Sequence, residues 1–99
     1  MTKKYIVIGN PIDHSLSPAI HNHWFKKNKI DAFYDKELVD KENLNTIIDK
    51  IRNKHLDGAN VTVPFKNLIV PLVDRLTSEA DVTKSVNTIY LDGKEVVGH

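Results

Sequence analysis

The stretch KYIVIGNPIDHSLSP, residues 4–18, places a run of apolar residues directly before a turn that is rich in proline and serine. Residues 5–8 are mostly β-branched, which is typical of a strand buried on both faces. Residues 9–11, Gly-Asn-Pro, should end this strand. Ser17 and Pro18 then predict the start of a helix, with serine as the N-cap and proline at the first helical position. A buried strand that leads through a tight turn into a helix indicates an α/β fold.

The rest of the chain continues this alternation. We expect Ile20 and Trp24 to contribute to an apolar face of the first helix, and a second strand over residues 32–39. Asp40 should cap the next helix, in which apolar residues recur at helical spacing: Leu44, Ile47, Ile48 and Ile51. A third strand is expected over residues 59–63.

The last third of the sequence predicts shorter elements. Pro71 limits a helix that begins near residue 65 to a turn or two, and Thr77 or Ser78 should cap another short helix that ends near residue 84. Residues 88–91 and 95–97 flank Asp-Gly-Lys and predict a hairpin. The whole pattern predicts one α/β domain over residues 1–99, with three α/β/α layers and a largely parallel mixed sheet that ends in a β-hairpin.

The composition excludes several classes of protein. Of the 99 residues, 40% are hydrophobic and 27% are charged, which is ordinary for a soluble globular domain. The formal net charge of +1 comes from interspersed lysines and acids, so neither a nucleic-acid partner nor a membrane is expected. There is no cysteine, which excludes disulfides and thiolate metal sites. No apolar run is long enough for a signal peptide or a membrane span, so we expect a cytoplasmic protein.

Polar residues cluster where the predicted strands end. Residues 10–17 follow the first strand, and GANVTVPFK, residues 58–66, covers the end of the third. Ligands of α/β sheets bind outside the carboxyl ends of the strands, so both clusters should face one crevice. Asn60 and Thr62 are two residues apart and should point to the same face of their strand. With Lys66 they supply an amide, a hydroxyl and an amine, a combination that suits a polyhydroxylated ligand.

Other polar residues extend this site or invite a different interpretation. SVNT, residues 85–88, adds the amide of Asn87 before the hairpin. Ser15 has no expected capping role. Of the two serines, Ser15 is therefore the stronger indication of a ligand-binding hydroxyl. His14 and His21 raise the question of a metal, but no metal-ligand spacing such as H-E-x-x-H is present, and we expect none.

Taken in order and at these spacings, GNPIDHSLSPAIHN, GANVTVPFK and SVNT resemble the N-terminal substrate-binding domain of shikimate dehydrogenases. The resemblance implies NADP-dependent reduction of 3-dehydroshikimate to shikimate in aromatic amino-acid biosynthesis. It also implies that Ser15 and Ser17 bind the substrate carboxylate. By the same resemblance, Asn60, Thr62 and Asn87 bind ring hydroxyls of the substrate. Lys66 would be the catalytic lysine.

The sequence departs from the family pattern at two places. The family usually has Gly-Ala where this chain has Lys84 and Ser85, a change that should affect local packing more than chemistry. Family members continue with an Asn-Thr-Asp segment and a Rossmann domain, whereas this sequence ends at His99 and contains no G-x-G-x-x-G. We therefore expect half of a substrate site and no NADP site in these residues, and a fragment that is inactive alone.

Two alternatives remain open at this stage. The chain could be an isolated, non-catalytic module that binds carboxylates or polyols, or it could belong to a quinate/shikimate dehydrogenase with relaxed specificity. Shikimate and 3-dehydroshikimate are the expected small-molecule partners, and a homodimer is one candidate assembly.

Overall fold

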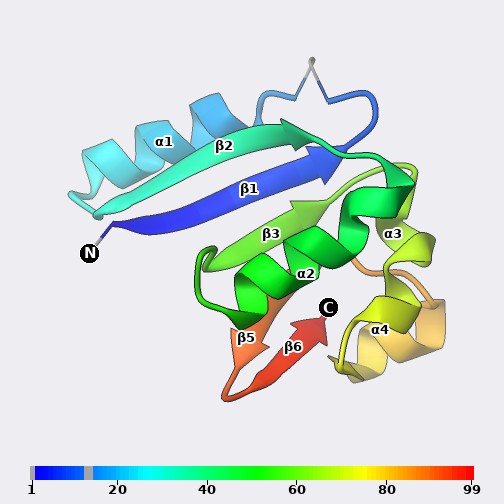
Figure 1. Cartoon of the computed structure of the whole chain (residues 1–99). Helices are drawn as coiled ribbons and strands as arrows, with labels where there is room; N and C mark the ends of the chain where they lie inside the picture. Colours follow the sequence, from blue (N-terminus) through cyan, green and yellow to red (C-terminus); the bar gives the residue numbers. More distant parts are fainter. Residues whose placement is uncertain (1, 13–14) are drawn as a thin grey trace.

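The computed structural model describes residues 2–12 and 15–99, and within them six strands form a single sheet in the order β2-β1-β3-β5-β6-β4 (Figure 1). The strands are β1 Lys3–Gly9, β2 Ala32–Leu38, β3 Gly58–Val61, β4 Arg75–Leu76, β5 Thr88–Asp92 and β6 Glu95–Gly98. In this sheet β5 runs antiparallel to its neighbours β3 and β6, and the other pairs are parallel. The prediction of a largely parallel mixed sheet with a terminal hairpin is confirmed.

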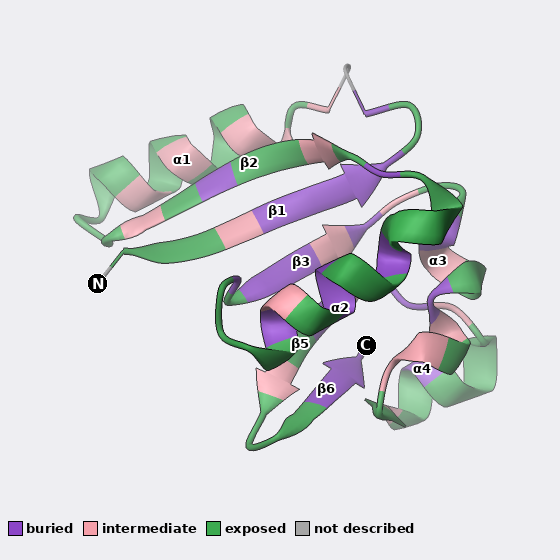
Figure 2. Cartoon of the chain, viewed as in Figure 1, coloured by how far each residue is buried: buried purple, intermediate pink, exposed green. Residues whose placement is uncertain are grey.

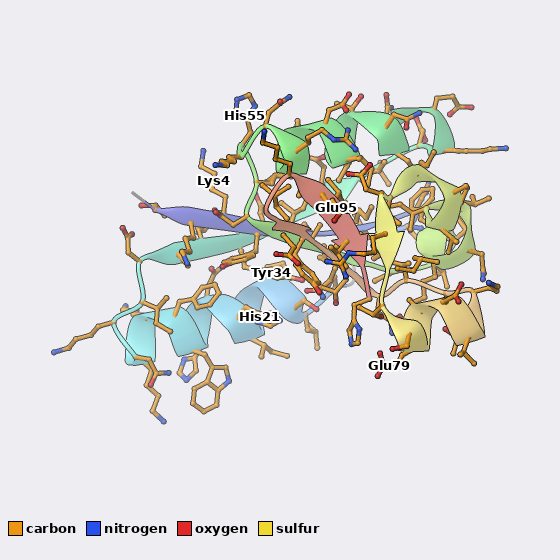
Figure 3. All side chains as sticks on the ribbon, turned by 90° about the horizontal axis from the view of Figure 1, so that it is seen from below. Lys4, His21, Tyr34, His55, Glu79 and Glu95 are labelled. Atoms are coloured by element: carbon orange, nitrogen blue, oxygen red, sulfur yellow. The ribbon has the colours of Figure 1, made fainter. Side chains whose placement is uncertain are left out.

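The two longest helices of the described residues lie on opposite faces of this sheet, as the view along the sheet in Figure 3 shows. They are α1 Ser17–Lys27 and α2 Leu44–Arg52, and the shorter elements are η1 Lys41–Asn43, α3 Phe65–Leu68, η2 Val70–Leu72 and α4 Ser78–Thr83. The result is the three-layer α/β/α arrangement that the sequence predicts. None of these helices is long and apolar enough to cross a membrane.

Strand β1 supplies apolar side chains to both layers, as its β-branched sequence predicts. Ile6 and Ile8 join the main core on the α2 side, whereas Val7 joins a second cluster on the α1 side. The predicted apolar residues of α2 are all buried in the main core (Figure 2): Leu44, Ile47, Ile48 and Ile51. Burial of each such side chain stabilises the fold by about 1.5–3 kcal/mol.

Helix α1 differs from its prediction at its start. Ser17 is not the N-cap: Leu16 occupies that position without a side-chain cap, and Ser17 is the first helical residue. Instead, the Ser15 hydroxyl accepts a hydrogen bond from the Ser17 backbone N–H at 3.3 Å, so Ser15 rather than Ser17 bonds to a backbone N–H at the start of the helix. His14 and the middle of the preceding turn lie outside the described residues.

The predicted apolar face of α1 is also wrong in part, because Ile20 and Trp24 are 53% and 51% exposed. The helix packs on the sheet through Phe25, beside Tyr5, and is also fixed to the edge strand β2 by polar contacts. The Asn22 side chain accepts from the Tyr34 backbone N–H at 2.8 Å and donates to the Tyr34 carbonyl at 2.7 Å. These two bonds occupy backbone groups of β2 that an additional strand would otherwise pair with.

In the last third of the chain, the helix cap and the hairpin turn lie where the sequence predicts them. Thr77 caps α4, with its hydroxyl accepting from the Ala80 N–H at 3.3 Å. Gly93 has a φ of +63°, as a tight hairpin turn requires. Strand β4 is not predicted by the sequence. It is held beside β6 by Asp74, which accepts from the Val96 N–H at 2.8 Å and pairs with Arg52.

Candidate functional site

The three polar motifs meet at one end of the strands, where β1 and β3 end and β5 begins (Figure 1). Backbone hydrogen bonds tie the loops together there. The Thr62 N–H donates to the Ile8 carbonyl at 2.9 Å, and the Val61 N–H donates to the Asn87 carbonyl at 2.7 Å. The Asn10 N–H donates to the Val63 carbonyl at 3.1 Å. The two clusters are thus joined, but the single crevice that was expected is divided, because Ser15 and Thr62 line one cavity and Asn60 lines another.

Ser15 and Thr62 share a cavity of about 240 Å³ whose other lining residues are Pro11, Ile12 and Val63. The Thr62 hydroxyl donates to the Ile8 carbonyl at 2.7 Å, so it can offer a ligand only the lone pairs of its oxygen. The Ser15 oxygen accepts from the Ser17 N–H, which leaves the Ser15 proton available for a ligand acceptor. The cavity therefore presents one donor and one acceptor.

Asn60 lines a second cavity of about 380 Å³ together with Tyr34 and His21, and this cavity extends to Lys3 and Ala32 at the start of β1 and β2. The Tyr34 hydroxyl donates to Asn60 Oδ1 at 2.6 Å, and Asn60 Nδ2 donates to Thr88 Oγ1 at 3.1 Å. One N–H of the Asn60 amide remains for a ligand. Asn60 and Thr62 line different cavities, although the buried residues beside them, Tyr34 and Ile12, belong to one cluster. That their side chains point to the same face of the strand remains a prediction.

The Tyr34 side chain is buried between the sheet and α1, where its ring stacks on His21 with centroids 4.3 Å apart (Figure 3). Burial raises the pKa of the Tyr34 phenol, and a hydrogen-bonding contact with the Ser17 hydroxyl offsets part of this shift. The phenol consequently stays protonated and remains a donor at neutral pH. Ser17 is thus associated with the Asn60 group, and Ser15 with the Thr62 cavity.

Lys66 and Asn87 are close in the backbone but are not joined by their side chains. The Val86 N–H donates to the Lys66 carbonyl at 2.9 Å, which brings the chain segment before Asn87 beside α3. Lys66 is half-buried next to the buried Phe65, and Asn87 is exposed. Within residues 2–12 and 15–99, neither side chain forms a hydrogen bond or an ion pair with another residue, so both are available to a ligand.

Sequence reasoning missed Tyr34 as a member of this site. It treated Tyr34 only as part of a strand, although a buried tyrosine hydroxyl normally needs a polar partner. Thr88 was part of the SVNT motif but was given no role. For a metal, the described part of the chain contains no group of three or more histidine or carboxylate residues that could hold an ion.

Comparison with known proteins identifies relatives of this arrangement. A family model described as the shikimate dehydrogenase substrate binding domain matches residues 7–89. A shikimate dehydrogenase (NADP(+)) from Pelagibacter ubique is 49% identical over 98 residues, which cover 99% of this chain and 37% of that protein.

Solved structures give the same result. A crystal structure of shikimate 5-dehydrogenase from Listeria monocytogenes in complex with shikimate and NAD has a TM-score of 0.91 at 35% identity, covering 99% of this chain and 34% of that one. A crystal structure of a shikimate dehydrogenase in complex with NADP+ also has a TM-score of 0.91 at 35% identity, with coverage of 98% and 34%. This sequence thus spans about a third of the length of these relatives. The match covers most of its residues, and the chain belongs to the shikimate dehydrogenase substrate-binding domain family.

Proposed function

We propose that this chain is the substrate-binding part of an NADP-dependent shikimate dehydrogenase that reduces 3-dehydroshikimate to shikimate. The observation that carries the proposal is that backbone hydrogen bonds join the three motif segments where β1 and β3 end, in a chain of this domain family. Shikimate is a ring that carries a carboxylate and several hydroxyls, so it needs a donor set for the anion and mixed partners for the hydroxyls.

The carboxylate is assigned to Ser15 and Ser17. Both residues lie at the start of α1, an 11-residue helix whose N-terminus carries a partial positive charge. The free proton of Ser15 is the better donor of the two, because the Ser17 hydroxyl already contacts Tyr34. The ring hydroxyls are assigned to Asn60, Thr62 and Asn87. Thr62 can act there only as an acceptor, since its proton is bonded to the Ile8 carbonyl.

Lys66 is assigned the proton-transfer role. Its amine makes no ion pair with another described residue, and it follows the strand that carries Asn60. When the ring ketone is reduced, negative charge develops on its oxygen. An ammonium group within about 3 Å would stabilise that charge and donate the proton that completes the alcohol.

The described residues do not suit the NADP cofactor. A dinucleotide pyrophosphate is bound by backbone N–H groups at a glycine-rich turn and a helix N-terminus. Here the turn after β1 contains Pro11, and α1 contains Pro18 in its first turn, so both positions lack an N–H. We place NADP in a part of the dehydrogenase outside residues 1–99. A cytoplasmic location and a homodimer remain predictions.

The test is a steady-state assay of the complete dehydrogenase that contains this chain, with NADP+ and either shikimate or quinate. We expect turnover of shikimate, with a higher kcat/KM than for quinate. Calorimetric titration with shikimate, in parallel, distinguishes the non-catalytic alternative. Binding of shikimate without turnover would indicate a carboxylate- or polyol-binding module, and a folded protein that neither binds nor oxidises shikimate would contradict the proposal.

A further inference from the structure

Tyr34 is the side chain of the site that is most deeply buried, at 3% exposure, and the sequence motifs assign it no role. Its hydroxyl lies 2.6 Å from Asn60 Oδ1, and the Asn60 amide nitrogen lies 3.1 Å from Thr88 Oγ1. The shorter distance is typical of an O–H···O bond and the longer one of an N–H···O bond. The amide oxygen of Asn60 thus faces Tyr34 and its nitrogen faces Thr88. The Ser17 hydroxyl contact on Tyr34, which favours the phenolate, is consistent with a phenol proton directed to Asn60.

This orientation decides what Asn60 offers to a substrate. With its oxygen directed to the phenol and one N–H to Thr88, the amide has one N–H and one oxygen lone pair left. Without the Tyr34 hydroxyl, the carbonyl end would lose its partner and both ends of the amide could exchange places. A substrate hydroxyl would then meet a mixture of donor and acceptor.

We propose that Tyr34 is a positioning residue, which holds the Asn60 amide in the one orientation that binds a ring hydroxyl of the substrate. This inference rests on the proposed function, because it assumes that Asn60 contacts the substrate. Tyr34 acts through Asn60 and does not itself touch the reacting atoms.

The structure around Tyr34 is built to keep the phenol in place. The Asn22 side chain holds both backbone polar groups of Tyr34, at 2.8 and 2.7 Å, and the His21 ring stacks on the phenol ring with centroids 4.3 Å apart. These contacts come from α1, whereas Asn60 lies on β3, so the phenol links the helical layer to the third strand. Because burial raises the pKa of Tyr34, the hydroxyl keeps the proton that it donates to Asn60.

The first experiment compares Tyr34→Phe with Tyr90→Phe in the complete dehydrogenase. Tyr90 lies on β5 outside both cavities, and its hydroxyl forms no hydrogen bond with another described residue, so the control removes the same atom without disturbing an amide. We expect Tyr34→Phe to raise KM for shikimate about tenfold, the effect of one disrupted buried hydrogen bond, with kcat within about threefold of wild type. Tyr90→Phe should leave both constants unchanged. An unchanged KM for a folded Tyr34→Phe enzyme would overturn the proposal.

A double-mutant cycle then separates positioning from simple packing. If Tyr34 acts through Asn60, Tyr34→Phe should add little to KM in an Asn60→Ala background, because the amide that it orients is gone. A full tenfold effect in that background would overturn the proposal. Failure of the proposed function is distinguishable, since wild-type enzyme would then show no shikimate turnover at all.

A third experiment does not depend on enzyme activity. It follows the side-chain amide signals of Asn60 in a proton–nitrogen NMR spectrum, and these signals are identified by their loss in Asn60→Ala. We expect Tyr34→Phe to shift these signals strongly and Tyr90→Phe to leave them in place. Identical Asn60 signals in wild type and Tyr34→Phe would overturn the inference whatever the enzyme's substrate.

Discussion

Gly9 lies directly against the side chain of Thr62, so that a Cβ atom on Gly9 would overlap with Thr62 Oγ1. The Thr62 hydroxyl occupies this space because it donates to the Ile8 carbonyl at 2.7 Å. The end of β1 and the loop after β3 can approach each other this closely only if residue 9 has no side chain. The glycine in the first motif and the threonine in the second are thus two parts of one contact.

We expect Gly9→Ala to destabilise the chain by about 1–3 kcal/mol, because the added methyl group forces the Thr62 hydroxyl away from its carbonyl partner. The same methyl would also lie 3.1 Å from Ile12 Cδ1 and 3.3 Å from the Val63 carbonyl oxygen. Urea unfolding of the two proteins measures the difference in free energy of unfolding. In a Thr62→Ala background most of the cost of Gly9→Ala should disappear, and a cost that is unchanged there would contradict the explanation.

Lys84 offers a stabilising substitution. It ends α4 in the left-handed conformation, with φ 55° and ψ 37°. A side chain in this conformation costs about 1–2 kcal/mol, whereas glycine adopts it without strain. We expect Lys84→Gly to raise the free energy of unfolding by about 1 kcal/mol in urea denaturation, after the loss of its exposed ion pair with Asp81.

Lys84→Ala is the matched control for this change. It removes the same ion pair but keeps the Cβ atom, so the strain remains and no gain in stability is expected. If alanine stabilised the protein as much as glycine, the backbone conformation would not be the cause.

The sequence predicts the layered fold well because most elements are set by local patterns. The apolar run of β1, the helical spacing in α2, the Thr77 cap and the Gly93 turn each act within a few residues. Strand β4 escapes prediction because it has two residues and depends on Asp74, whose partners Arg52 and Val96 are far away in the sequence. The exposure of Ile20 and Trp24 escapes for a similar reason, since α1 contacts the sheet through Asn22 and Phe25, whose partners Tyr34 and Tyr5 are distant in the sequence.

The site is predictable as a set of residues and less so as a set of contacts. The rule that polar loops gather at the carboxyl ends of strands brings the three motifs together correctly. The direction of each hydroxyl proton cannot be predicted in this way, because it depends on hydrogen-bond partners that are close only in the folded chain. Thr62 bonds to Ile8, Ser15 accepts from the Ser17 N–H, and Asn60 bonds to Tyr34 across 26 residues of sequence.

Ser15 is expected to contribute to both substrate binding and the local fold. In the complete dehydrogenase, Ser15→Ala should raise KM for shikimate about ten- to a hundredfold, by removing a charge-assisted hydrogen bond of about 1.5–3 kcal/mol. Because the Ser15 oxygen also accepts from the Ser17 N–H, a small decrease in melting temperature should accompany this change. Ser15→Thr keeps the hydroxyl and should retain a KM near that of wild type. An unaltered KM with a lowered melting temperature would show that Ser15 is purely structural.

The assignment of Lys66 is tested most sharply by Lys66→Met in the complete dehydrogenase. Methionine keeps most of the packing of the lysine stem beside Phe65 but removes the charge and the donors. If the ammonium stabilises and protonates the developing alkoxide, kcat should fall by about 10²–10⁴-fold, far more than KM rises. Stopped-flow or steady-state measurement of NADPH oxidation gives both constants, and circular dichroism confirms that the variant folds.

Lys94→Met is the matched control, because Lys94 is exposed in the turn between β5 and β6, at the far end of the hairpin from Asn87. It changes the net charge by the same amount, so an effect of overall charge on the binding of an anionic substrate would appear in both variants. We expect normal kcat for Lys94→Met and a near-inactive Lys66→Met. A well-folded Lys66→Met enzyme with kcat within about threefold of wild type, a difference of only ~0.7 kcal/mol, would mean that the Lys66 amine is merely solvated and that another group supplies the proton.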